Sequence, residues 1–303
     1  MIRFAITCIA ALVVGASSAV AAGRLELSLR PSQPDFVLAE PVTVIARLAN
    51  AGDGPIQAPR YLEPEYASVT YTIAGPIQGA FVPWAIKEPE QPFVTLQPGQ
   101  VIEQEVELFY GGNGWTFRQP GQYEIRATAL GSITSAPMTL SIRAPGSDAE
   151  RSAAERMINS DEAGRFLLFR GGEHLAEGRS ILESVVATAP ETPHAAFANV
   201  ALGINDLRQA RNFATGTVRQ ANPEAALQRL NMVQVRDLPV SWVVESNVGL
   251  AKALRDTGQP ARAMEIEGRL PDLVQQQFQG INPAILREQI IPDVRRNLQL
   301  EAN

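Results

Sequence analysis

Four aromatic residues beside glycine- and proline-rich segments are the best candidates for ligand binding: Trp84, Tyr110, Trp115 and Phe117. Three of them flank Gly111–Gly114, whose Gly-Gly-Asn-Gly run predicts a tight loop because such residues tolerate positive φ angles. An aromatic ring held in a loop by a rigid scaffold offers a flat face to a sugar or a peptide. The alternative interpretation is that the rings fill one end of a hydrophobic core.

Histidine and cysteine are too scarce to predict a metal centre. The two histidines, His174 and His194, are far apart in the chain and form no HExxH motif. We expect each of them to be structural or exposed to solvent. The only cysteine, Cys8, lies in the apolar N-terminal segment. We therefore predict no metal and no other cofactor.

Glutamates alternate with apolar residues along one predicted strand, at Glu103, Glu105 and Glu107. A catalytic pair of carboxylates needs one desolvated member with a raised pKa, and a solvated row lacks that contrast. We interpret this row as the solvent face of the strand. The sequence contains no GxSxG, SxxK, P-loop or GxGxxG motif. It therefore favours a protein that is not an enzyme, with a hydrolase that uses scattered acidic residues as an alternative.

The N-terminal residues have the pattern of a secretory signal peptide. Arg3 precedes the apolar segment Phe4–Gly15, which is short for a membrane span, and Ala19–Ala22 offers cleavage sites. We assign residues 1–22 to this peptide, whose removal takes Cys8 with it. We expect a periplasmic or secreted protein without an integral membrane segment after cleavage. The alternative is an anchored N-terminal helix.

Length and composition predict two soluble domains. The chain has 303 residues, of which 45% are hydrophobic, and this length fits about two domains. Its net charge of −6 argues against a general nucleic-acid or anionic-membrane surface. We therefore expect no nucleic-acid partner.

Apolar and polar residues alternate with a period of two through residues 23–143. The alternation is clearest in Leu25–Leu29, Val42–Leu48 and Val101–Tyr110, and turns rich in glycine and proline separate these segments. Roughly seven strands at this spacing predict a β-sandwich domain.

The segment Gly121–Ile125 (GQYEI) resembles the tyrosine corner of immunoglobulin-type sandwiches. The resemblance implies that the Tyr123 hydroxyl bonds back to the backbone. Antibody domains carry a half-cystine where this chain has Ile125, so no inter-sheet disulfide is expected. The run from Glu40 to Ile56 (EPVTVIARLANAGDGPI) also resembles the opening strands of bacterial extracytoplasmic sandwich domains. Those domains act as adhesive modules, inhibitors or spacers.

Beyond a linker at residues 144–147, the apolar period changes to that of helices. Helices are predicted to start at Ser160, at Thr192-Pro193 and at Asn222-Pro223, because these residues cap a helix or fit its first turn. Three further helical pieces are expected toward the C-terminus: Pro260–Gly268, Pro271–Gln279 and Pro283–Leu300.

Two helical pairs recur at a spacing of about 48 residues, since Leu182 matches Leu230 and Pro190 matches Pro239. This order resembles a degenerate tetratricopeptide-type stack of helical hairpins, although that family repeats every ~34 residues. The additional residues of the longer period fall in the segment Asn205–Ala221, between the two helical pairs. An irregular helical bundle is the alternative.

We therefore expect an α+β protein of two domains. Residues 23–143 would form an all-β immunoglobulin-like sandwich, and residues 148–303 an all-α tetratricopeptide-like hairpin stack. The predicted function is that of a non-enzymatic exported scaffold or adaptor whose helical domain binds a protein or peptide. The alternative is a carbohydrate- or cell-envelope-binding module that uses the four loop aromatics.

Overall fold

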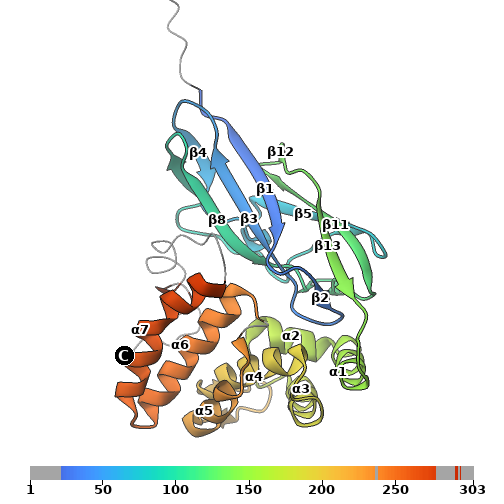
Figure 1. Cartoon of the computed structure of the whole chain (residues 1–303), viewed down its shortest axis with the longest axis vertical. Coiled ribbons are helices and arrows are strands. Elements are labelled where there is room, and N and C mark those ends of the chain that lie inside the picture. Colours follow the sequence, from blue (N-terminus) through green and yellow to red (C-terminus); the bar gives the residue numbers. More distant parts are fainter. Residues whose placement is uncertain (1–21, 236–237, 278–290, 293, 295–303) are drawn as a thin grey trace, which may run out of the picture.

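The computed structural model describes residues 22–235, 238–277, 291, 292 and 294, which form a mixed α and β structure. Strands β1–β13 lie within residues 25–143 and helices α1–α7 within residues 148–277. Figure 1 shows these strands on one side of the molecule and the helices on the other. The predicted signal peptide (1–22) and the predicted helix Pro283–Leu300 lie almost wholly outside the described residues.

Two larger sheets and two short strand pairs make up the strand-rich half. One sheet has the order β1 (Leu25–Pro31), β3 (Thr43–Asn50), β8 (Val101–Glu107). The other has the order β2 (Phe36–Val37), β13 (Met138–Arg143), β11 (Gly121–Ala129), β5 (Val69–Ala74), β6 (Gly79–Ala80), with β12 (Ile133–Thr134) beside β11. The short pairs are β4 (Ile56–Pro59) with β7 (Phe93–Leu96), and β9 (Tyr110–Gly111) with β10 (Gly114–Trp115).

Alternate residues of these strands form the hydrophobic core. In β11, Tyr123, Ile125 and Ala127 are buried while the residues between them reach solvent, as the alternation predicts. The Tyr123 hydroxyl donates a hydrogen bond of 2.8 Å to the carbonyl of Gln119. The bond back to the chain that the sequence resemblance implies is therefore present.

Within the described residues, seven helices follow: α1 (Asp148–Ile158), α2 (Asp161–Phe169), α3 (Ala176–Thr188), α4 (Pro193–Asp206), α5 (Pro223–Asn231), α6 (Val240–Asp256) and α7 (Pro260–Gln277). The predicted caps are confirmed, because the side chains of Ser160, Thr192 and Asn222 each accept a first-turn N–H. The predicted linker is short and ordered: Ser147 caps α1, and Arg143 pairs with Glu150 at 3.0 Å.

Helices that follow one another in the chain pack side by side, and α4 also touches both α2 and α6. Phe197 of α4 meets Trp242 of α6 edge to face at 4.8 Å. The predicted break before Pro271 is wrong, since α7 continues through this proline. Leu270 and Val274 are buried on one face of α7, and their packing offsets the hydrogen bond that proline removes.

The helical half is not wholly helical. A hairpin of β14 (Ala210–Arg211) and β15 (Val218–Arg219) joins α4 to α5. It occupies the excess segment Asn205–Ala221 that lengthens the predicted repeat. The prediction of an all-α half therefore needs this correction.

Candidate functional site

The two halves meet on a ring cluster. Gly164 of α2 lies so close to Tyr110 that a Cβ at this position would stand 2.2 Å from the ring atom Cδ2. The Trp115 indole N–H donates to the backbone carbonyl of Ser160 at 3.1 Å. Tyr110 and Trp115 contact each other edge to face at 5.8 Å. The aromatic residues that flank the Gly111–Gly114 loop thus hold helix α2 against the strands.

A buried arginine forms the second junction. Arg170 ends α2 and pairs with Glu107 of β8 at 2.6 Å and with Glu245 of α6 at 2.5 Å. Its guanidinium also lies 3.6 Å from the ring centroid of Trp242. Burial alone lowers the pKa of Arg170, but the two carboxylates outweigh it and raise that pKa overall. The Arg170 guanidinium therefore links α2, β8 and α6, which are far apart in the sequence.

Glu105 is the third junction and corrects the prediction of a solvated glutamate row. Its carboxylate accepts hydrogen bonds of 3.1 Å from both the backbone N–H and the hydroxyl of Ser241. Burial raises the pKa of Glu105 from 4.5 to about 7. Only Glu103 behaves as predicted, with an exposed bond to Arg30. The end of β8 that carries Glu105 and Glu107 is covered by helix α6.

The raised pKa of Glu105 predicts a pH dependence of stability. The folded state holds its proton up to about pH 7, whereas the unfolded chain releases it near 4.5, so ionisation between these values lowers the free energy of unfolding. We expect Glu105→Gln to remove about 1–2 kcal/mol of the stability difference between pH 4 and pH 8. Urea unfolding of both proteins at the two pH values measures it. Equal differences in the two proteins would contradict the assignment.

His194 is structural, as the sequence suggests. It is buried, and its Nε2 lies 2.8 Å from the backbone carbonyl of Leu38 in the strand-rich half. Burial lowers the pKa of His194. His174 is exposed. Among the described residues, no group of three or more histidine, cysteine, aspartate or glutamate side chains is placed to hold a metal.

The four predicted ligand-binding aromatics have different surroundings. Tyr110, Trp115 and Phe117 are each 3% exposed. Phe117 packs edge to face on Tyr123 at 5.0 Å, inside the core. Trp84 is 43% exposed and is the only one of the four with a broad free surface. The ligand-binding prediction therefore keeps its basis at Trp84.

Trp84 belongs to an apolar patch that spans both halves. We call this the Trp84 patch: Val82, Trp84, Ile86 and Phe169, each more than 40% exposed. Trp84 meets Phe169 of α2 edge to face at 5.9 Å, and the Arg165 guanidinium lies 5.7 Å from the Trp84 ring centroid. Sequence reasoning missed Phe169 and Arg165, because only the packing of α2 brings them to this loop.

A partly open cavity of about 210 Å³ adjoins the patch through Val82. It lies between β6 and the chain from Asn113 to Arg118, and we call it the β6 slot. Ile77, Phe81 and Trp115 give it apolar walls. The glycine-rich loop thus borders a cavity, although its neighbouring rings are mostly buried.

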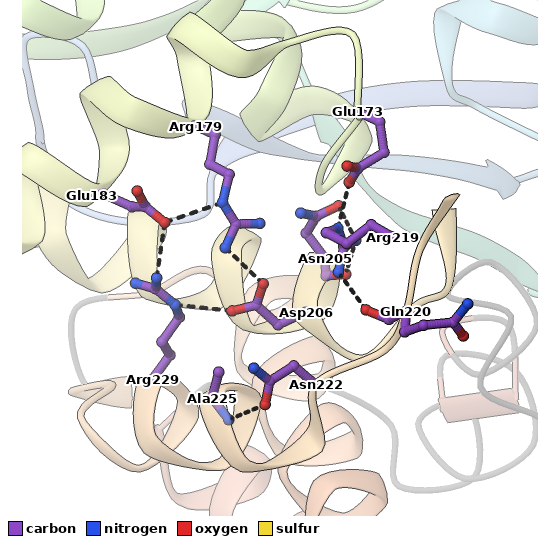
Figure 2. A network of polar contacts seen from close by, with 10 residues as sticks. All are labelled: Glu173, Arg179, Glu183, Asn205, Asp206, Arg219, Gln220, Asn222, Ala225 and Arg229. Carbon is purple, nitrogen blue, oxygen red and sulfur yellow. Dashed lines mark hydrogen bonds and ion pairs between the residues drawn. The ribbon is translucent and has the colours of Figure 1, made fainter. Parts of the chain in front are cut away.

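A charged network, in contrast, is internal to the helical half (Figure 2). Asp206 is 2% exposed and pairs with Arg179 at 2.8 Å and with Arg229 at 3.0 Å. Glu183 bridges the same two arginines. Arg219 of the β14–β15 hairpin pairs with Glu173 at 2.5 Å. Glu183, Asp206 and the two arginines thus join α3, α4 and α5, while Arg219 holds the hairpin to α4 by donating to the backbone carbonyl of Asn205 at 2.7 Å.

No helix among the described residues has the length and apolarity needed to cross a membrane.

Comparison with known proteins gives no assignment. No protein-family model matches the chain, and no curated protein matches it. A β-glucosidase structure from Erythrobacter marinus aligns at 21% identity over 39% of this chain and 15% of its own, with a TM-score of 0.25. A β-glucosidase structure from Listeria innocua aligns at 16% identity over 41% of this chain and 16% of its own, with a TM-score of 0.25. A β-glucoside glucohydrolase from Trichoderma reesei aligns at 16% identity over 41% of this chain and 19% of its own, with a TM-score of 0.23. Each match spans less than a fifth of the glucosidase, and TM-scores this low carry no argument about fold or activity.

Proposed function

We propose that the chain is a non-enzymatic exported protein that binds a protein partner through the Trp84 patch. The observation that carries the proposal is the contact between two exposed rings, Trp84 of the strand-rich half and Phe169 of the helical half, with exposed Val82 and Ile86 two residues to either side of Trp84 in the chain. Scattered single apolar residues are normal on a surface, whereas a contiguous cluster marks an interaction site. Export rests on the signal-peptide pattern of residues 1–22.

The composition of the patch favours a protein over other ligands. Tryptophan, which the patch contains, and arginine, which flanks it as Arg165, are enriched among the side chains that dominate the binding energy of protein interfaces. Trp84 is already oriented by Tyr110, Phe169 and Arg165, so little conformational entropy is lost when a partner covers it. The buried junctions at Arg170 and Gly164 fix the position of the helical half relative to the strand-rich half.

We also infer the architecture behind this surface. The Tyr123–Gln119 bond and the two large sheets support an immunoglobulin-like sandwich over residues 23–143. The sequential packing of α3 to α6 supports a degenerate tetratricopeptide-like stack within residues 148–303. Partner binding then uses the seam between sandwich and stack.

Truncating the two rings of the patch is expected to weaken partner retention without unfolding the protein. We expect Trp84→Ala with Phe169→Ala to weaken retention at least tenfold, since truncating a hot-spot tryptophan costs ~2 kcal/mol or more. The measurement is affinity capture from envelope extract with the full exported chain. Phe213→Ala is the matched control, because Phe213 is 88% exposed and distant in sequence from the patch.

A second candidate function is glycan binding by the exposed face of Trp84. Retention on peptidoglycan or on immobilised glycans separates the two. Glycan retention that is lost in Trp84→Ala, with no protein captured by the unmodified chain, would replace the proposed function with this one.

A further inference from the structure

Strand β6 leaves an open edge on the six-stranded sheet. It is the last strand in that sheet, and its residues Gly79 and Ala80 are exposed. The N–H of Phe81 donates to the carbonyl of Tyr71 at 2.8 Å, and Ala80 stands opposite Thr72 in the next register position. Because bonded and non-bonded positions alternate in antiparallel pairs, the N–H and C=O of Ala80 point away from β5.

The β6 slot lies along this edge and is closed at one end. There, the carbonyl of Val82 accepts a hydrogen bond of 2.9 Å from the N–H of Gly112. A Cβ on Gly111 would stand 2.2 Å from the same carbonyl, so only glycine allows the β9–β10 turn to approach so closely. Beyond this contact the slot is open, and the outward groups of Ala80 face it.

The chemistry of the slot fits a peptide. Its volume of about 210 Å³ is below the roughly 300–1,000 Å³ of small-molecule pockets, and it suits one or two apolar side chains. Arg118 lines the slot and is exposed, and no ion-pair partner for it lies among the described residues. An unpaired main-chain edge, apolar walls and a free cation together favour an extended segment with one apolar and one acidic side chain.

We propose that the β6 slot receives an extended segment of the partner as an added strand. The added strand bonds to the outward N–H and C=O of Ala80, places an apolar side chain between Phe81 and Trp115, and pairs an acidic side chain with Arg118. This inference rests on the proposed function, because Val82 joins the slot to the Trp84 patch. The partner thus covers the patch with its folded surface and the slot with one strand.

A displayed library of random seven-residue peptides, selected on the full exported chain, tests the proposal. We expect the recovered peptides to share an apolar residue followed at an alternate position by aspartate or glutamate. A synthetic peptide of that pattern is expected to bind at least tenfold more weakly to Arg118→Glu and to Ala80→Pro, which removes the outward N–H. Arg151→Glu, an exposed arginine of α1, is the charge-matched control and is expected to change affinity less than twofold.

Hydrogen exchange at Ala80 separates strand addition from adsorption. The Ala80 amide is expected to exchange at least tenfold more slowly when the peptide is bound. Recovered peptides without a shared pattern, unchanged affinity in Arg118→Glu, or unchanged exchange at Ala80 would each overturn the proposal.

If the slot variants keep the protein partner while the patch variant loses it, the slot proposal fails and the proposed function holds. If peptides select the slot but no protein is captured, the proposed function fails by itself.

Discussion

Replacing Arg170 by methionine is expected to lower the free energy of unfolding by about 3–5 kcal/mol at pH 8. The guanidinium neutralises Glu107 and Glu245 in an environment where Arg170 is 6% exposed. Methionine fills similar space but removes the cation that pairs with both carboxylates. The loss should shrink toward pH 4, because burial raises the pKa of Glu245 and its protonated carboxyl needs no counter-charge. Urea unfolding at both pH values measures it.

The control for Arg170 is an arginine in an exposed ion pair. Arg126 pairs with Glu124 at 2.9 Å, but both side chains are nearly half exposed. We expect Arg126→Met to change stability by less than about 1 kcal/mol. A loss at Arg170→Met no larger than this would show that the buried charges do not join the halves.

Substituting alanine for Gly164 is expected to lower the free energy of unfolding by about 1–3 kcal/mol. The new Cβ would meet the Tyr110 ring at 2.2 and 2.3 Å and the Trp115 ring at 3.1 Å. All three contacts are with ring atoms of buried side chains, so relief requires α2 to move away from the strands. Chemical unfolding followed by tryptophan fluorescence measures the loss.

Gly268→Ala is the matched control, since Gly268 is a helical glycine with open space around its added Cβ. Alanine there removes the helix penalty of glycine, and we expect a gain of up to about 1 kcal/mol. Changes of the same sign at the two glycines would contradict the close packing of α2 on Tyr110.

The sequence predicts what is local in this fold. Ser160, Thr192 and Asn222 cap helices through bonds to residues a few positions ahead, so their spacing suffices. The alternation in β11 likewise identifies which side chains are buried. Such signals depend only on the neighbouring chain.

What covers a face is not local. Alternation correctly places Glu105 and Glu107 on the outer side of β8, but it contains no information about helix α6, which packs on the end of that strand. The same limit applies to Tyr110 and Trp115, which the sequence places beside a glycine-rich loop and the structure places under α2. Gly164 is the one signal in the sequence, because glycine lowers the stability of a helix. Its presence inside a predicted helix therefore indicates that another group needs the space a side chain would fill.

The candidate site was predictable only in part. Trp84 stands in a proline-rich loop and was identified from sequence, whereas Phe169 and Arg165 join it through tertiary packing. The β6 slot was beyond prediction, since β6 is two residues long and its edge depends on a short hairpin register. Short strands carry too little alternation to reveal their pairing.

The most direct measurement is site-specific photocrosslinking from position 84 in the full chain, with position 213 as the control. Both side chains are exposed, so a photoreactive phenylalanine analogue reaches solvent at either site. We expect one discrete protein adduct from position 84 and none from position 213. No adduct from position 84, or the same adducts from both positions, would contradict partner binding at the Trp84 patch.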